Sequence, residues 1–133
     1  MKLDKDCRYA ETHEWVRVDG NEATVGITDY AQQQLSDVVY VELPEIGDVF
    51  ERGGVFATVE SVKAAADVYM PIGGEITEVN EVLEDAPQLV NEDPFEAAWF
   101  ARFTASDLSE LDDLMDAEAY EKFVAEEEAE GGS

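Results

Sequence analysis

One lysine in the middle of the chain is the first candidate for chemistry. Three of the four lysines lie in the terminal segments: Lys2, Lys5 and Lys122. The fourth, Lys63, lies between Val62 and Ala64 at the junction of two expected strands. An ammonium group at a hairpin tip is accessible to a modifying enzyme and can carry an acyl group through an amide bond, which removes its charge. The alternatives are a solvated turn lysine or one that protects a strand edge against aggregation.

The other reactive residue types form no recognisable site. His13 is the only histidine and has no triad or metal-ligand pattern around it, so we expect a structural or hydrogen-bonding role near a surface cleft. Cys7 is the only cysteine, which excludes an intramolecular disulfide and a cysteine metal cluster. Among 33 acidic residues, pairs such as Glu11 and Glu14 arise by chance. Without a glycine-rich phosphate loop or a G-x-S-x-G motif, an enzyme with its own active site is the least supported class.

The charge balance excludes whole classes of partner. The chain has 33 Asp and Glu against 8 Lys and Arg, a formal net charge of −25 on 133 residues, and 45% of its residues are hydrophobic. This composition suits one folded acidic domain, but it lacks the clustered cations that bind nucleic acid or an anionic membrane. No apolar run approaches the roughly 20 residues of a membrane helix, and the first residues lack the apolar stretch of a signal peptide. We therefore expect a cytoplasmic protein.

The negative charge also points to the environment of the protein. Self-repulsion of this size works against a compact state unless salt screens it. At about 1 M salt the Debye length falls to about 3 Å, so neighbouring carboxylates hardly interact. The sequence therefore favours a halophile with a salty cytoplasm, and an acidic surface suited to a basic partner is the alternative.

Hydrophobic runs between turn signals predict a mostly β body over residues 8–104. Six strands are expected: Ala23 to Thr28, Val38 to Leu43, Val55 to Val62, Ala65 to Met70, Glu75 to Val79 and Ala98 to Phe103. Their spacing is typical of a sandwich or barrel. Asp29 to Leu35 is predicted to form a short helix with Thr28 or Asp29 as its N-cap. Lys63 then lies at the tip of a tight hairpin.

A helical, acidic tail follows over residues 106–130. Its apolar residues recur at spacings of three and four: Leu108, Leu111, Met115, Tyr120, Phe123 and Val124. This pattern predicts that the tail docks on the β body. We expect its end, Glu126 to Ser133, to fray, and the acids Glu126 to Glu128 to lie away from the functional hairpin.

A series of ordered motifs resembles the H proteins of the glycine cleavage system. The main matching strings are Tyr9 with His13-Glu14-Trp15, Gly26-Ile27-Thr28 with Tyr30-Ala31-Gln32, Val39-Tyr40-Val41-Glu42-Leu43-Pro44, and Glu60-Ser61-Val62-Lys63-Ala64. Single residues that also match include Asp67, Pro71, Asn80, Leu83, Pro87, Asn91 and Trp99. The resemblance covers roughly residues 8–124.

The resemblance implies a barrel-sandwich hybrid fold, like that of lipoyl and biotinyl domains, with a short internal helix and C-terminal helices. Residues 1–133 would form a single lipoyl-carrier domain, monomeric and without turnover of its own. Lys63 would carry lipoate in amide linkage within the string Glu60, Ser61, Val62, Lys63, Ala64. A lipoate-attaching enzyme would modify it. The arm would then visit a pyridoxal-phosphate glycine decarboxylase, a tetrahydrofolate-dependent aminomethyltransferase and a dihydrolipoyl dehydrogenase.

The resemblance also implies a cleft for the loaded arm. Thr12, Glu14 and Asp67 match the positions where this family holds the aminomethyl group. That group is cationic when protonated, so two carboxylates can dock it while a hydroxyl adds a hydrogen bond. Shelter from water would slow its hydrolysis. For docking on partner enzymes we expect an apolar surface beside Lys63, made of Val62, Ala64, Ala65 and Ala66, because apolar burial persists in salt.

Two residues depart from the family pattern, and several alternatives stay open. Ser36 and Ala98 stand where the family usually has glycine, so a positive φ at either place would be strained. A biotinyl domain is disfavoured because Lys63 is not flanked by methionines. A lipoyl domain of a 2-oxo-acid dehydrogenase usually has Asp before its lysine. A lipoate relay and an unmodified β interaction module complete the alternatives.

Overall fold

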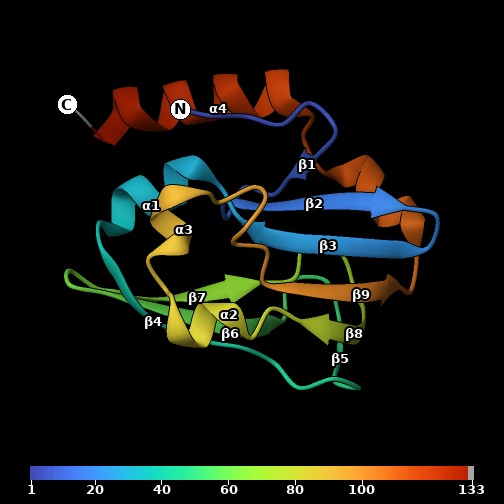
Figure 1. Ribbon diagram of the computed structural model, residues 1–133. Helices are drawn as coiled ribbons and strands as arrows, with labels where there is room; N and C mark the ends of the chain where they lie inside the picture. Colours follow the sequence, from blue (N-terminus) through green and yellow to red (C-terminus); the bar gives the residue numbers. More distant parts are fainter. Residues whose placement is uncertain (132–133) are drawn as a thin grey trace.

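Two antiparallel β-sheets with helices around them form the body of the protein (Figure 1). The computed structural model describes residues 1–131. The larger sheet has the order β1-β2-β3-β9-β8-β5, with the bounds Arg8–Tyr9, Glu14–Asp19, Glu22–Ile27, Ala101–Ala105, Gly74–Val79 and Val49–Phe50. The smaller sheet has the order β4-β6-β7, with the bounds Val38–Glu42, Val55–Ser61 and Ala65–Tyr69. The helices are α1 (Asp29–Leu35), α2 (Val82–Asp85), α3 (Leu89–Glu92), the 3₁₀-helix η1 (Leu108–Asp113) and α4 (Ala117–Gly131).

The expected mostly β architecture with an internal helix and C-terminal helices is confirmed. The expected strands that became β3, β4, β6, β7 and β8 agree with the structure to within one residue at each end. The last strand begins at Ala101, three residues later than expected. Before that point the carbonyls of Ala97 and Trp99 accept hydrogen bonds from the Asn80 side chain, both at 2.8 Å, instead of pairing with a strand.

Strand β2 was not expected from the sequence, although it carries Glu14. Its residues Glu14, Trp15 and Val16 are all buried, so the alternation of buried and exposed residues that marks a half-buried strand is missing. The cause is that both faces of β2 are covered. Val16 belongs to the core between the sheets, whereas Trp15 belongs to a second cluster on the outer face.

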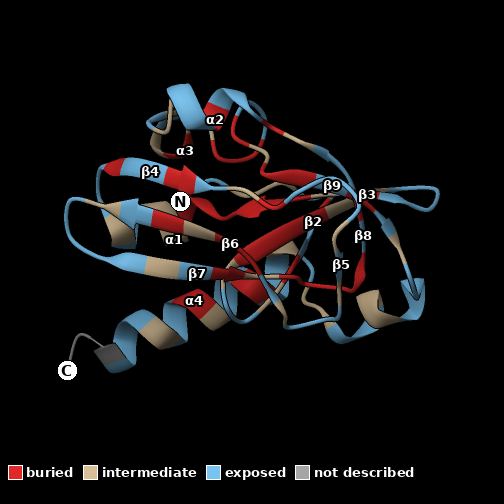
Figure 2. Cartoon of the chain, turned by 90° about the horizontal axis from the view of Figure 1, so that it is seen from below, coloured by how far each residue is buried: buried red, intermediate tan, exposed pale blue. Residues whose placement is uncertain are grey.

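The two apolar clusters lie on opposite faces of the larger sheet. The core between the sheets contains buried residues from both sheets, among them Val25, Val59 and Phe103. In Figure 2 the red, buried parts of β2, β6 and β7 mark this interior, and the exposed faces are pale blue. Gly26 lies opposite Trp15 in the β2–β3 ladder, and a Cβ on Gly26 would come within 2.7 Å of the indole ring. The glycine therefore makes the room that Trp15 occupies.

Helix α4 docks on the outer face, as the tail pattern predicted. Tyr120 is fully buried and stacks on Tyr9 with ring centroids 4.6 Å apart. The expectation that the chain frays from Glu126 is wrong for residues 126–131, which continue α4. Packing of Phe123 and Val124 in the outer cluster holds this part of the helix to the body. Residues 132 and 133 lie outside the described part of the chain.

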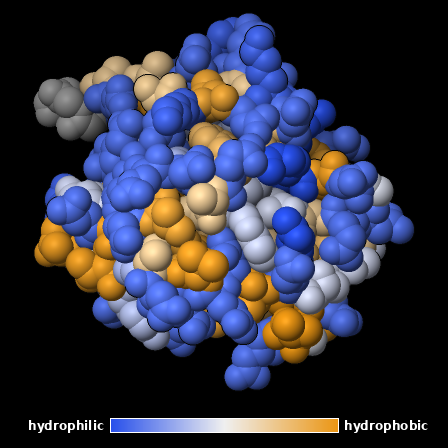
Figure 3. Space-filling model, in the orientation of Figure 1, coloured by the Kyte–Doolittle hydropathy of each residue, from blue (hydrophilic) through white to orange (hydrophobic). Residues whose placement is uncertain are grey.

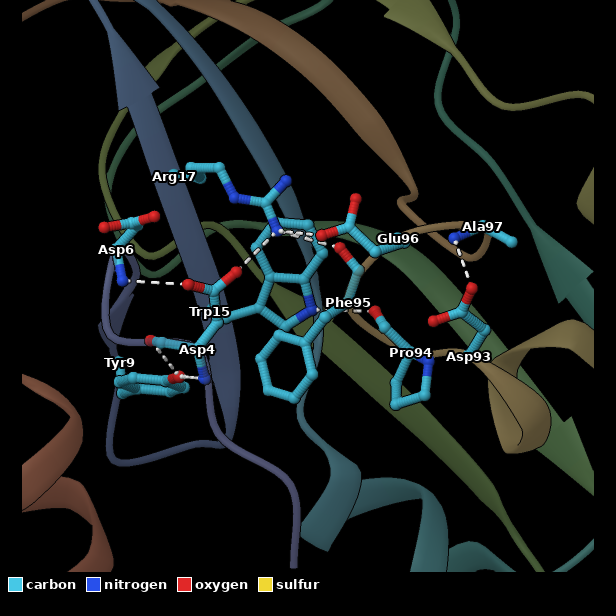
Figure 4. A network of polar contacts seen from close by, with 10 residues as sticks. All are labelled: Asp4, Asp6, Tyr9, Trp15, Arg17, Asp93, Pro94, Phe95, Glu96 and Ala97. Carbon is cyan, nitrogen blue, oxygen red and sulfur yellow. Dashed lines mark hydrogen bonds and ion pairs between the residues drawn. The ribbon is translucent and has the colours of Figure 1, made fainter.

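The N-terminal segment is fastened to the loop before β9 by a polar network (Figure 4). Arg17 donates from Nη2 to the carbonyl of Phe95 at 2.8 Å and to the Asp4 carboxylate at 3.1 Å. The indole N–H of Trp15 donates to the carbonyl of Pro94 at 3.0 Å. These bonds hold the outward-facing side chains of Trp15 and Arg17 on β2. They thereby help to fix the register of β2 and the position of Glu14 at its start.

Helix α1 begins as predicted, with Thr28 as its N-cap. The Thr28 hydroxyl oxygen accepts from the backbone N–H of Ala31 at 3.1 Å. At the other end Ser36 has φ 66° and ψ −150°, a conformation that glycine adopts at little cost. The predicted strain is therefore present at Ser36. Ala98 has no positive φ, so the replacement of the family's usual glycine there carries no such strain.

Candidate functional site

The hairpin between β6 and β7 holds Lys63 at its tip. Ser61 closes the turn: its N–H donates to the carbonyl of Ala64 at 2.8 Å, and its hydroxyl oxygen accepts from the N–H groups of Lys63 at 3.1 Å and Ala64 at 3.0 Å. A hydroxyl suits this position because one oxygen can accept twice and still donate. The turn is thereby fixed without help from the Lys63 side chain.

The Lys63 side chain is exposed and uncommitted within the described chain. None of the ion pairs found among residues 1–131 involves it. Its neighbour Val62 is 69% exposed, and the N–H of Val62 donates to the carbonyl of Asp37 at 3.0 Å, which ties the hairpin to the start of β4. A lysine that supports no structure is free for modification.

Exposed apolar residues surround the hairpin tip. Val39 and Tyr40 on the neighbouring strand β4 are 53% and 48% exposed. Figure 3 shows hydrophobic residues at the left edge of the molecule, where Figure 1 places the tip of the β6–β7 hairpin. Ala64 and Ala65 are also exposed, whereas Ala66 is half-buried.

A cleft of about 450 Å³ lies beside this hairpin and brings the three predicted cleft residues together. Thr12 reaches it from the turn before β2, Glu14 from the first position of β2, and Asp67 from β7. Lys63 is not part of the lining. Asp67 lies on β7, four residues after Lys63, so its Cα is at most about 13 Å from that of Lys63 at about 3.3 Å per residue. A long acyl chain on Lys63 can span this distance.

Glu14 is the buried acid of the cleft, with 2% of its surface exposed. Its carboxylate accepts from the Thr12 hydroxyl and, at 3.2 Å, from the backbone N–H of Tyr69 on the other sheet. Burial raises the pKa of Glu14 from 4.5 to about 7, although both of these hydrogen bonds act in the opposite direction. The carboxylate is therefore incompletely solvated, and a cation near it would gain a strong partner.

The rest of the lining is largely apolar. The aliphatic members are Ile27, Ala31, Leu35, Val59, Ala66 and Val68. Asp67 is exposed at the rim, opposite Thr58 in the β6–β7 ladder. The cleft thus offers apolar walls to a hydrocarbon chain and, with Glu14 and Asp67, carboxylates to a cationic end, which fits an alkyl arm that carries an amine.

Sequence reasoning missed several lining residues, of which Glu127 is the most informative. Glu127 lies on α4 and was expected to be distant from the site, but it lines the cleft and its Oε2 is 2.9 Å from Nε2 of His13. Docking of Phe123 and Val124 turns this face of α4 inward, because residues three and four apart share a helix face. That spacing was the available signal. Tyr30 and Gln34 of α1 were also missed.

His13 has the hydrogen-bonding role near a cleft that was expected. Its Nδ1 is 2.8 Å from the Tyr120 hydroxyl, and its ring lies in the cleft wall. Burial lowers the pKa of His13, while Glu127 acts to raise it.

Cys7 is buried and its thiol is free, and burial raises its pKa to about 12. Among the described residues no group of three His, Cys, Asp or Glu is placed to hold a metal ion.

Comparison with known proteins identifies the family. The model of the family described as "Glycine cleavage H-protein" matches residues 7–127. The chain belongs to this family. It is 54% identical over 127 residues to the glycine cleavage system H protein of Thermus thermophilus. The matched region covers 96% of this chain and 99% of that relative. It is 51% identical over 128 residues to the H protein of Anaeromyxobacter sp., and this match covers 96% of this chain and 100% of the relative.

A solved H-protein structure has the same fold. The crystal structure of a glycine cleavage system H protein from Mycobacterium marinum superposes with a TM-score of 0.82 at 30% identity, covering 94% of this chain and 98% of the other. The expected barrel-sandwich fold of lipoyl carriers is thereby confirmed. Among the described residues, none of the helices combines the length and the apolar character that a bilayer crossing requires.

Proposed function

We propose that this chain is the lipoyl carrier of the glycine cleavage system, a carrier component and not a catalyst. It would take the aminomethyl group of glycine from the decarboxylase to the aminomethyltransferase and then present the reduced arm to the dihydrolipoyl dehydrogenase. Membership of the H-protein family supports this role. The observation that carries it is the place of Lys63, exposed at the tip of a turn closed by Ser61, with an apolar, acid-ended cleft along the same hairpin.

Lys63 is the proposed attachment site for lipoate, within the string Glu60, Ser61, Val62, Lys63, Ala64. Its Nζ would form the amide bond to the lipoyl carboxyl group, and the dithiolane supplies the redox and group-carrying chemistry when it is bound. Val62 and Ala64, on either side of Lys63, are both exposed, so a modifying enzyme would reach the lysine without obstruction from them.

Thr12, Glu14 and Asp67 are the proposed residues that hold the load. Glu14 sits at the deep end of the cleft and Asp67 at its rim, so a bound ammonium group would meet a carboxylate from either sheet. Thr12 hydrogen bonds to Glu14 and orients its carboxylate. The aliphatic walls would keep bulk water away from the bond that is prone to hydrolysis.

The proposed partners are the three enzymes of the system and the enzyme that attaches lipoate. All must approach the tip of the β6–β7 hairpin, since the attachment lysine is there. We propose that they dock on Val62, Ala64, Ala65 and Ala66, which are apolar and exposed or half-buried. No nucleic-acid or membrane partner is proposed, because the charge of −25 disfavours both.

The setting of the protein is proposed from its composition. A net charge of −25 on 133 residues is best explained by a salty cytoplasm in a halophile, where screening removes most of the self-repulsion. In this setting the chain would act as a monomer and as a single domain, with the β body over residues 8–104 and the tail over 106–130.

Intact mass measurement of the protein from its native cell tests the proposed function. We expect a mass increase of one lipoyl group, located on Lys63 by peptide mapping. A biotinyl group at the same lysine would indicate a biotin carrier instead. An unmodified Lys63 in cells that are catabolising glycine would refute the carrier role and favour an interaction module.

A further inference from the structure

His13 has a strained backbone in the middle of the cleft turn. It adopts φ 74°, one of only two positive values for non-glycine residues among residues 1–131. Its N–H donates to the carbonyl of Ala10 at 3.0 Å, and its carbonyl accepts from the N–H of Thr28 at 3.1 Å. Thr12 and Glu14 flank it, so the conformation of His13 sets how these two side chains enter the cleft. Such strain persists only where surrounding contacts enforce it.

The His13 ring joins a chain of hydrogen bonds from α1 to a close contact with a carboxylate of α4. The Ala31 N–H donates to the Thr28 hydroxyl oxygen at 3.1 Å, and the Thr28 and Tyr120 hydroxyls lie 2.8 Å apart. Tyr120 Oη is 2.8 Å from Nδ1 of His13, and Nε2 of His13 is 2.9 Å from the Glu127 carboxylate. A neutral imidazole with its proton on Nε2 would accept from the Tyr120 hydroxyl and turn its N–H toward Glu127, so that the contacts run in one direction, from Ala31 to Glu127.

Aromatic contacts reinforce the same link. The His13 ring lies 4.9 Å from the Tyr30 ring of α1 and 5.8 Å and 6.0 Å from the rings of Tyr120 and Phe123 of α4, measured between centroids. Both Tyr30 and Glu127 line the cleft. Helix α4, which is distant in sequence from the attachment hairpin, is therefore part of the cleft wall.

We propose that His13 is a positioning residue that fastens α4 to the turn bearing Thr12 and Glu14, so that the cleft retains its load only while α4 is in place. The proposal rests on the proposed function. It assigns the C-terminal helix a share in load retention, and it predicts that loosening the end of α4 opens the cleft. Glu127 and Tyr120 act through His13, and they need not touch the load.

Variants on each side of the contact test this link. His13→Asn suits the backbone, because asparagine tolerates positive φ, but its side chain is too short to bridge Tyr120 and Glu127. Glu127→Ala removes the contact from the α4 side. The matched control is Glu126→Ala, which removes the same charge from an exposed neighbour on the same helix. Glu127→Gln keeps an acceptor for the Nε2 proton.

Two readouts are needed, one of which does not depend on the cofactor. In the unmodified protein, we expect amide hydrogen exchange in α4 to be about fivefold faster in His13→Asn and Glu127→Ala than in the control, the effect of losing one hydrogen bond. In the lipoylated, loaded protein, we expect the load to be lost about fivefold faster in the same two variants. Glu127→Gln should restore both rates.

The double variant separates a shared contact from two separate effects. His13→Asn with Glu127→Ala should be no worse than the worse single variant, since both remove the same link. Fully additive effects would overturn the proposal, as would a load lifetime equal to that of Glu126→Ala or a failure of Glu127→Gln to rescue. A wild-type protein that is never lipoylated or loaded refutes the proposed function instead, and the exchange rates still test the link to α4.

Discussion

The carboxylate of Glu14, on the larger sheet, accepts a hydrogen bond from the backbone N–H of Tyr69, on the smaller one, at 3.2 Å. This bond crosses between the sheets at the deep end of the cleft. It places an ionisable group where burial is nearly complete, and the pKa of Glu14 rises to about 7 for that reason. The free energy of unfolding and the charge inside the cleft therefore both depend on the protonation of Glu14.

Stability should depend on pH through Glu14. Its pKa is raised from 4.5 to about 7 on folding, so its contribution is fully present below about pH 4.5 and is lost as the pH rises to about 7. Glu14→Gln lacks this dependence. The free energy of unfolding of the variant relative to wild type should rise by about 3 kcal/mol from pH 4.5 to pH 8, measured by denaturant unfolding at constant salt. Parallel curves for the two proteins would contradict the assignment.

Removing either cleft charge should shorten the life of the load but leave lipoylation unchanged. Glu14→Gln and Asp67→Asn keep the size of each side chain, and both lie away from the attachment bond on Lys63. Each ionic hydrogen bond contributes about 1.5 to 3 kcal/mol at most, and less at the exposed rim, so Glu14 should matter more than Asp67. The measurement is the decay of the loaded protein, with Glu75→Gln as an exposed control. If the load decays at the wild-type rate in both variants, Glu14 and Asp67 do not hold it.

Lys63→Arg should abolish carrier function without changing the fold. Arginine keeps the charge but offers no amine for acylation, and the turn is held by Ser61 and not by the lysine side chain. Circular dichroism and the melting temperature should match wild type. Glycine cleavage by this variant in a reconstituted system would show that the arm is attached elsewhere.

Replacing Ser36 by glycine should stabilise the protein by about 1 to 2 kcal/mol, because φ 66° with ψ −150° strains any side chain. Ala98→Gly is the matched control, since the family usually has glycine there too. Ala98 has no positive φ and is buried, so its replacement should destabilise. Thermal unfolding of the two variants measures the contrast, and changes of the same sign would refute it.

Salt should decide both folding and docking. We expect unfolding at low ionic strength that molar KCl reverses, because the charge of −25 is then screened.

In molar KCl, Ala65→Glu should raise the apparent KM of the decarboxylase for the lipoylated carrier, since docking at the hairpin is apolar. Because Glu127 lines the cleft, the distant acid for comparison is Glu121, which is exposed on α4. A larger effect of Glu121→Gln would show that docking is electrostatic.

The sequence alone determined most of the local structure and singled out a candidate attachment site. Hydrophobic, β-rich runs between turn residues located five strands to within one residue, and the Thr28 cap located α1, because these signals act over a few residues. Lys63 was singled out because it is the only lysine outside the terminal segments and stands between two expected strands, and the resemblance to the H-protein family made it the candidate for lipoylation. The strain at Ser36 was likewise visible from its position in the family pattern.

Only the tertiary structure decided how the cleft is built. Strand β2 lacks the alternating pattern because α4 and the second sheet cover opposite faces of it, and neither cover is encoded near residues 14–19. The raised pKa of Glu14 arises from burial against a strand more than fifty residues away. Glu127 joins the cleft only because α4 docks through Tyr120 and places its carboxylate against His13. Burial and long-range contacts are sums over the whole fold, so no local window of sequence contains them.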